Sequence, residues 1–537
     1  MAANEQELCG GQLRTRDIWA LGVGIVVCGQ YFGWNLGLKD NGPVAMLLAS
    51  LVVCLLFLAW VLALSELAVA MPRAGGPLDY GLRAGGRWLG FVMGWSLFLA
   101  CLFGGVATAL AGGKYVAFLF APAAPDPHLA VAAGLGIVAG FFALQFRGVK
   151  EQARALVLMT YAAVLGLVVF WPAAASNFSW ARVWATPAIP AEKGWKAVLD
   201  AVPFALWWLI IIEAAALAAE EAHAPRRTVP RGLTWAVVTV IGMIVLTTVT
   251  ACGALPFQQI AAKDGKDIDY PLAEVVRNIP AGRSGVLLYG FGVIALFGLV
   301  ASYHGLLYGG SRQLYALGRA GFLPRALGRT HAERRTPVPA LAACSLLTAG
   351  FVVANLWFED AVKVAVLVAG FAALVLYLLS MVSLFALRRR EPSLLAGYRA
   401  PLGRWLPAAV VVLAALALAA YPRLDAKVVP LAAAVYAVGL VTFALRRRRW
   451  DAPPPVPERS EASPDTASGW GRRVAVGVLL VAVVGVVAVA SAGFGGPDAV
   501  GPATNAAALT LLTVVVAALV AVGAAALRQA RTEDDAR

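Results

Sequence analysis

Long apolar runs alternate with short polar segments along almost the whole of this 537-residue chain. A run of about 20 apolar residues is long enough to cross the ~30 Å hydrocarbon core of a bilayer as an α-helix. We count fourteen such runs, twelve of them in residues 17–445 and two in residues 474–527. The pattern predicts an all-α polytopic membrane protein with a twelve-helix body and two extra C-terminal transmembrane helices.

The polar segments between the runs divide the chain further. Residues 1–16 form a polar N-terminal tail and residues 528–537 a charged C-terminal tail. Residues 446–473 are rich in proline and charge, which predicts an extended or disordered linker. The two spans after this linker carry almost no polar side chains, so we expect an anchor or an oligomer contact there. Chemistry is expected in the first ten spans, where polar residues interrupt the apolar pattern.

Composition and charge restrict the class of protein. Hydrophobic residues make up 60% of the chain and charged residues only 14%, which excludes a soluble protein. The net charge is +14, but most Lys and Arg fall in segments that face the cytoplasm when the N-terminus is placed there. This distribution follows the positive-inside rule. It predicts a multi-pass protein of the cell (inner) membrane with both termini cytoplasmic, and no nucleic-acid partner. The excess of Arg over Lys indicates a bacterial source.

The first span is interrupted by small and polar residues where it should be most apolar. Cys28, Gly29, Gln30 and Tyr31 follow one another at the expected depth of the bilayer centre. Irregular backbone at this depth is tolerated only inside protein or beside a wet cavity, and transporters bind substrates at such breaks. The four residues are therefore candidate substrate ligands. The alternative is that the glycines form a packing notch between close helices.

The sixth span carries an acidic residue near its middle, Glu213, after the aromatic pair Trp207 and Trp208. An ionisable group within a membrane span is costly and is a candidate functional group by default. Glu213 could bind a cationic group or carry a proton, and both Trp side chains are included as candidate substrate contacts. The alternative for Glu213 is a structural hydrogen bond. His304, in the eighth span, is a further candidate ligand, against the alternative that it only packs.

Three carboxylates at the predicted cytoplasmic ends of spans are candidate gates. Glu66 precedes the turn-rich sequence MPRAGGPLDYG, and Glu220 and Glu221 lie beside Arg226 and Arg227. The six cysteines and four histidines are scattered, without the spacing of a metal site or a disulfide framework. One central Glu and one His do not form the cluster that a membrane enzyme needs. We therefore predict no enzyme, no metal and no cofactor.

Taken together, these segments resemble the amino acid–polyamine–organocation (APC) permeases. The likeness runs from the interrupted first span through MPRAGGPLDY and AEEAHAPRRTVPRG to SRQLYALGRAGFLP and TPVPAL, in residues 17–445. YFGWNLGL, WWLIIIEAAALAAEEA and SYHGLLYGGSRQLYALGRAG are most similar to the ethanolamine permeases. The resemblance implies a LeuT-type fold, with spans one to five repeated in inverted form by spans six to ten. It places the substrate between the first and sixth spans.

The resemblance also marks departures. Cys28, Gly29 and Gln30 occupy the place of a glycine-rich break that holds a carboxylate in relatives, so an amide here suits a substrate without one. Ile211 stands where relatives have a glycine in the sixth span. Ala163 stands where proton-coupled relatives often carry a lysine, which leaves the coupling ion, proton or sodium, open.

These observations predict a secondary transporter that imports a small organic amine, with ethanolamine as first choice, by alternating access. One alternative is an amino acid permease of the same superfamily. Another is a non-transporting membrane sensor built on a permease fold, which the long linker and the extra spans would suit.

Overall fold

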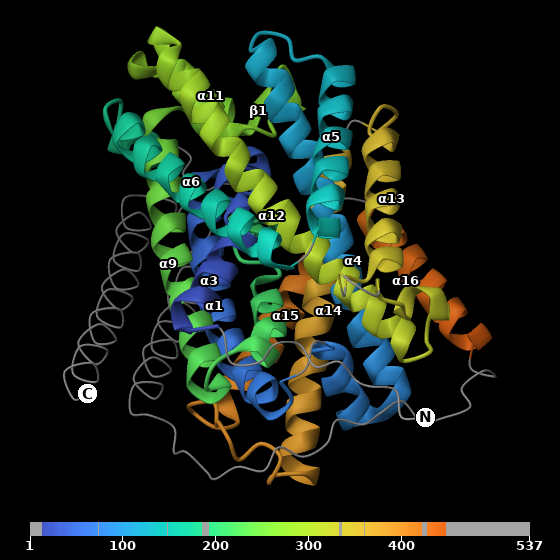
Figure 1. Ribbon diagram of the computed structural model, residues 1–537. Helices are drawn as coiled ribbons and strands as arrows, with labels where there is room; N and C mark the ends of the chain where they lie inside the picture. The colour runs from blue at the N-terminus through green and yellow to red at the C-terminus, as the bar shows by residue number, and fades with distance from the viewer. Residues whose placement is uncertain are drawn as a thin grey trace.

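The computed structural model describes residues 13–72, 75–147, 149–184, 193–331, 334, 336–358, 360–421 and 427–446. In these ranges the chain is almost entirely helical (Figure 1). A short hairpin pairs β1 (Ala262–Lys263) with β2 (Lys266–Asp267) in antiparallel fashion.

The long helices follow the apolar runs of the sequence. In chain order they are α3 (Leu38–Ala70), α4 (Pro77–Phe120), α5 (Pro127–Arg147), α6 (Val149–Ala175), α9 (Pro225–Ala254), α12 (Val286–Arg319), α13 (Val338–Ala354), α14 (Ala361–Arg390), α15 (Trp405–Ala420) and α16 (Val428–Arg446). Shorter elements form the first and sixth spans: α1 (Thr15–Val26), α2 (Cys28–Tyr31) and η1 (Trp34–Gly37), then α8 (Lys196–Ala205), η2 (Leu206–Trp208) and η3 (Ile212–Glu221). The connections contain α7 (Trp180–Val183), α10 (Phe257–Ala261), α11 (Pro271–Asn278), η4 (Pro280–Ser284) and η5 (Arg325–Gly328).

Nine helical segments within the described ranges are long and apolar enough to cross a membrane, and α13 and α15 are shorter apolar helices. This confirms the prediction of a polytopic helical membrane protein. The layout of twelve spans plus two stays a prediction, because α1 and α2 are short pieces of one broken span. The linker beyond Arg446 and the two spans in residues 474–527 lie outside the described residues.

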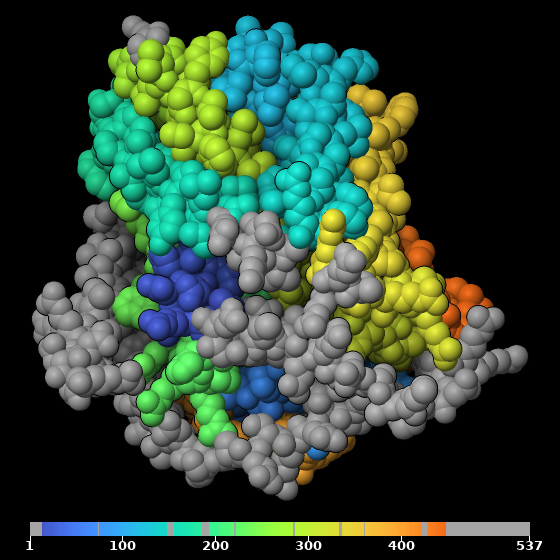
Figure 2. Space-filling model, in the orientation of Figure 1, coloured from blue at the N-terminus to red at the C-terminus, as the bar shows by residue number. Residues whose placement is uncertain are grey.

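The helices differ in how deeply they are buried. The apolar stretch of α3 is almost wholly buried, whereas that of α16 is mostly exposed, so α3 lies in the core and α16 at the periphery. Helix α6 runs across the face shown in Figures 1 and 2. Its outward side exposes large apolar side chains, among them Leu158, Tyr161 and Leu165. A large exposed apolar surface of this kind marks contact with a membrane.

Two interrupted helices occupy the middle of this core. The first comprises α1, α2 and η1, and the second comprises α8, η2 and η3. Helix α1 packs against η3, α9 and α12, and α8 packs against α3 and η1. The two interruptions are therefore brought together inside a shell of long helices, which fixes the position of the candidate site.

Candidate substrate site

The first span is interrupted at two places. In a continuous helix the Cys28 N–H would donate to the carbonyl of Gly24. Here it donates to Ser302 Oγ at 3.0 Å, and that hydroxyl donates to the Gly24 carbonyl at 3.1 Å. A side chain of α12 is thus inserted into the helical hydrogen-bond ladder, a recognised cause of helix distortion. The second interruption follows Tyr31, where Phe32 is extended and Gly33 has a φ of +92°.

The sixth span is also interrupted, although residues 204–231 contain no glycine. Helix α8 passes into η2, and Leu209–Ile211 separate η2 from η3. Ile211 has a φ of +70°, in the left-handed region. This conformation is a genuine outlier for a β-branched residue and costs on the order of 1–3 kcal/mol. The surrounding packing must supply this energy, because the local sequence does not favour the break.

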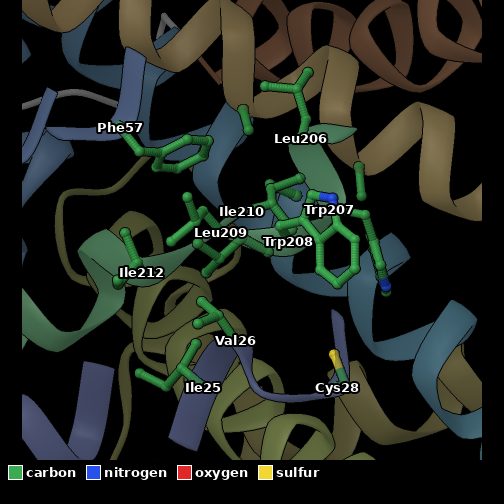
Figure 3. Close-up of a cluster of buried hydrophobic side chains, with 14 of the residues drawn as sticks. Ile25, Val26, Cys28, Phe57, Leu206, Trp207, Trp208, Leu209, Ile210 and Ile212 are labelled. Carbon is green, nitrogen blue, oxygen red and sulfur yellow. The ribbon is translucent and has the colours of Figure 1, made fainter. Parts of the chain in front are cut away.

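The two interruptions pack directly on each other. A Cβ atom at Gly29 would lie 2.7 Å from the Trp207 carbonyl oxygen and 3.0 Å from Trp208 Cα. One at Gly33 would lie 2.4 Å from Trp207 Cδ1. Figure 3 shows Val26 and Cys28 of the first span facing apolar side chains of the sixth span, such as Trp208. The glycines therefore form a packing notch within a broken span, and a substrate-ligand role for this stretch stays a prediction.

Replacing Gly29 by Ala is expected to destabilise the protein by about 1–3 kcal/mol, the usual cost of overpacking a tight core. The added methyl group would meet backbone atoms of Trp207 and Trp208, which cannot rotate away. Thermal unfolding of the purified protein measures the effect. Gly140 is the matched control, because a Cβ there meets nothing within 4 Å. An equal loss of stability in both variants would show that the notch is not tight.

Gln30 is fully buried between the interrupted spans. Its Oε1 accepts a hydrogen bond from Thr247 Oγ1 of α9 at 2.8 Å, and its main-chain carbonyl accepts one from Trp34 Nε1 at 3.2 Å. Its Nε2 has no hydrogen-bond partner within the described part of the chain. A buried polar group without a partner is uncommon, which marks Gln30 Nε2 as a candidate contact for a solute.

Cys28 and Tyr31 make contacts that fix the first span. The Cys28 thiol lies 4.0 Å from Thr108 Oγ1 of α4. The Tyr31 hydroxyl donates to the carbonyl of Ala163 on α6. Ala163 is the position at which proton-coupled relatives were expected to carry a lysine, and here its main chain bonds a tyrosine instead.

The two tryptophans of η2 have different partners. Trp208 Nε1 donates to Ser50 Oγ at 2.9 Å, and its ring stacks on Trp34 with the ring centroids 5.2 Å apart. Trp207 packs edge-on against Phe32, and its Nε1 has no partner among the described residues. Trp207 therefore offers a buried donor beside Gly29 and Gly33, whereas the indole N–H of Trp208 is already bonded.

Glu213 lies in the first turn of η3, immediately after the interruption. Its Oε2 accepts a hydrogen bond from the Tyr377 hydroxyl of α14 at 3.2 Å. Its Oε1 is buried and has no hydrogen-bond partner in the ranges that the structure describes. The carboxylate thus takes part in a structural hydrogen bond with Tyr377, and the buried indole N–H of Trp60 lies beside it.

His304 makes its polar contacts away from Glu213. Gln145 Nε2 of α5 lies 3.1 Å from His304 Nδ1 and donates to the His304 carbonyl at 2.9 Å. The imidazole also packs near Phe141. These contacts fit the packing alternative, and a ligand role for His304 stays a prediction.

A loop covers the interrupted spans on one side. Asn35 Nδ2 donates to the carbonyls of Ile260 and Ile268 at 3.3 and 2.7 Å, and the Gly33 N–H donates to Asn35 Oδ1 at 3.1 Å. The ion pair Lys114–Asp269 attaches the same loop to α4. Partial burial raises the pKa of the nearby Asp267 carboxyl, and Lys363 and Lys39 oppose this rise.

An ion pair closes the opposite end of α3. Glu66 is fully buried, and its carboxylate accepts hydrogen bonds from Arg388 Nε at 3.0 Å, Arg388 Nη2 at 2.6 Å and the Ala400 N–H at 2.9 Å. These contacts hold α3, α14 and the segment at Ala400 together, and a role for Glu66 as a gate stays a prediction. Glu220 and Glu221 lie at the end of η3, but their side chains lie outside the described part of the structure.

The site is closely packed. A small cavity between α4, α12 and α13, lined by Cys101, Tyr303 and Cys344 among others, has room for about one water molecule. No group of three or more His, Cys, Asp or Glu residues that could hold a metal occurs in the described ranges. In this closely packed arrangement, a small solute can be enclosed only after the helices move.

Several residues of the site were not predicted from the sequence. Ser302, Thr247 and Tyr377 act through hydrogen bonds to residues more than 150 positions away. Ser302 belongs to the polar patch SYHG, so a signal for it was present. Thr247 is one of several threonines in α9, and Tyr377 lies in the apolar middle of α14, so nothing in the sequence singled out either residue.

Most of the chain is similar in sequence to known proteins. The family model described as amino acid permease matches residues 17–445. The chain is 24% identical over 409 residues to the branched-chain amino acid permease of Bacillus subtilis, covering 73% of this chain and 83% of that protein. It is 26% identical to the gamma-aminobutyric acid permease of Escherichia coli (71% and 81% covered) and 23% identical to the methylthioribose transporter of Bacillus subtilis (72% and 83% covered). The solutes in these names differ, so the similarity supports a transporter without identifying its solute.

Proposed function

Because the chain belongs to the amino acid permease family, we propose that it is a secondary transporter that imports a small organic amine by alternating access, with ethanolamine as the first candidate. Relatives of the chain are permeases, which are transporters and not enzymes, so the function class is transport. The proposal adds the solute and the residues that bind it.

One observation carries the proposal. Two interrupted helices meet in the core, and beside them Gln30 Nε2 and Glu213 Oε1 are buried without hydrogen-bond partners among the described residues. The first is a donor and the second an acceptor. Once helix movement opens a cavity between these groups, a solute with an ammonium group and a hydroxyl group would satisfy both, because its N–H groups would meet Glu213 and its oxygen would meet Gln30. Ethanolamine is a small amine with this pattern.

The interrupted helices also suit the proposed LeuT-type inverted repeat, in which spans one to five correspond to spans six to ten. Half-helix termini and irregular backbone at the repeat interface bind substrate in such transporters. Ser302 holds the first interruption from α12 and Tyr377 holds Glu213 from α14. Movement of either helix would therefore change the site.

An amino acid is the second candidate solute. The free donor on Gln30 would serve a carboxylate as well as a hydroxyl group, and the names of two relatives, the branched-chain and gamma-aminobutyric acid permeases, specify amino acids. A carboxylate would then replace the hydroxyl group while the ammonium keeps its place at Glu213.

Uptake into proteoliposomes tests the proposal. Purified full-length protein is reconstituted, and entry of labelled ethanolamine, leucine and gamma-aminobutyric acid is measured with and without a pH or a sodium gradient. Entry of ethanolamine above that in protein-free liposomes is expected. Entry of an amino acid alone would select the second candidate, and binding without entry would indicate a sensor. The gradients identify the coupling ion.

A further inference from the structure

Gln30 is the end of a chain of hydrogen bonds that crosses three helices. Trp171 Nε1 of α6 donates to Thr247 Oγ1 of α9 at 3.2 Å. Thr247 Oγ1 in turn donates to Gln30 Oε1 of α2 at 2.8 Å. Thr247 and Gln30 are both fully buried. Neither of these two hydrogen bonds belongs to the regular backbone pattern, so the side chains themselves determine the arrangement.

The donor properties of the three side chains fix the direction of this chain. An indole N–H can only donate, whereas a hydroxyl group donates one hydrogen and accepts others. The Thr247 oxygen accepts from Trp171, so its own hydrogen is available for Gln30 Oε1. If the Gln30 amide were reversed, Thr247 would face two donors, and both its hydrogen and Gln30 Oε1 would lack partners. Buried unsatisfied groups are costly, which selects the observed orientation.

The orientation leaves the Gln30 NH₂ group as the unpartnered end of the chain, and this group has no partner in the described ranges. We propose that Thr247 and Trp171 are positioning residues that present Gln30 to the solute as a hydrogen-bond donor. The solute must therefore carry an acceptor oxygen, from a hydroxyl group or a carboxylate, at this end. This inference rests on the proposed function and adds the chemical requirement on one end of the solute.

The requirement separates the two ends of the solute. A donor at Gln30 disfavours an ammonium group there, because two sets of N–H groups would meet. The ammonium is therefore directed to the carboxylate of Glu213, whose Oε1 is free of partners among the described residues. A plain alkylamine would leave the Gln30 donor unpaired and should bind more weakly than an amine of similar size with an acceptor oxygen.

Binding of two matched pairs tests the inference on the purified full-length protein. The pairs are ethanolamine with ethylamine, and leucine with 3-methylbutylamine, so each pair differs in the acceptor group. The wild-type protein is expected to prefer the acceptor-bearing member of the pair that it binds by roughly tenfold, the effect of one hydrogen bond to a buried donor. Thr247→Val should bring the two affinities close together. Thr247→Ser should restore the preference, because it restores the hydroxyl group.

Two further variants complete the test. Trp171→Phe removes the donor that directs Thr247 and should reduce the preference without changing Thr247 itself. Thr248→Val is the matched control, because Thr248 is the adjacent buried threonine and its hydroxyl has no hydrogen-bond partner within the described chain. It should keep the wild-type preference.

The outcomes distinguish this inference from the proposed function. An unchanged preference in both Thr247→Val and Trp171→Phe, with the wild-type protein binding an acceptor-bearing solute, would overturn the positioning role alone. Equal wild-type affinity for both members of a pair would overturn the donor assignment. Failure of the wild-type protein to bind any of the four solutes would overturn the proposed solute class, and the inference with it.

Discussion

Replacement of Glu213 by Gln is expected to weaken binding of ethanolamine by roughly tenfold to a hundredfold. The glutamine keeps the size of the side chain and an oxygen for the Tyr377 hydroxyl, but it removes the charge that an ammonium group would meet. A hydrogen bond to a charged group contributes ~1.5–3 kcal/mol, and 1.4 kcal/mol corresponds to a factor of ten in affinity. Isothermal titration calorimetry on the purified protein measures the dissociation constant.

Two variants control for indirect effects at Glu213. Tyr377→Phe removes the structural hydrogen bond while keeping the carboxylate, so its effect on affinity should be smaller, on the order of 1 kcal/mol. Glu220→Gln, at the end of η3, should change the transport rate more than the affinity. Wild-type affinity in Glu213→Gln would mean that Glu213 is structural and that main-chain groups alone hold the amine.

Replacement of Glu66 by Ala is expected to cost about 3–5 kcal/mol of stability, the typical result of removing one partner from a buried ion pair. The change leaves the Arg388 guanidinium, which is itself mostly buried, without its carboxylate. It also removes the acceptor of the Ala400 N–H, so three segments lose their common contact. Unfolding of the purified protein by a denaturing detergent, followed by tryptophan fluorescence, gives the change.

The pair Lys427–Asp360 provides a control of the same charge type, because both of its side chains are largely exposed. Exposed pairs contribute about 0–1 kcal/mol, so Asp360→Ala should change stability little. Replacing Glu66 and Arg388 together by Met should recover part of the loss, since no unpaired charge stays buried. If Glu66→Ala is no more harmful than Asp360→Ala, the buried pair does not hold the ends of α3 and α14 together.

The sequence was sufficient to predict the membrane class, the interrupted first span and the acidic group of the sixth span. An amide next to glycines at bilayer depth is uncommon enough to signal irregular structure, and an isolated carboxylate there is equally conspicuous. The sequence predicted the position of the irregular backbone less accurately. The ladder is opened at Cys28 by Ser302, and the chain turns at Gly33, whereas Gly29 lies within α2 and serves close packing.

The interruption of the sixth span could not be predicted from local sequence, because no glycine marks it. Ile211 adopts the left-handed conformation through tertiary packing, and a β-branched residue would locally indicate regular structure. The partners of the site residues were unpredictable for a similar reason. Arg388 belongs to the run Arg388–Arg390, and only the fold shows that it pairs with Glu66.

The hydroxyl of Ser302 has a mechanical consequence for the conformational cycle. It joins the Cys28 N–H and the Gly24 carbonyl to α12 through two hydrogen bonds that share one oxygen. Separating α1 from α12 would break both bonds in one step, so these two segments should rotate together as a single rigid body. Bending of the first span would then be concentrated at Phe32 and Gly33, where the backbone is already extended and left-handed. The chain would thus have a hinge at Phe32 and Gly33 on one side of Gln30 and a fixed anchor at Cys28 on the other. Bending at the hinge would change the access of a solute to the Gln30 amide without moving the anchor.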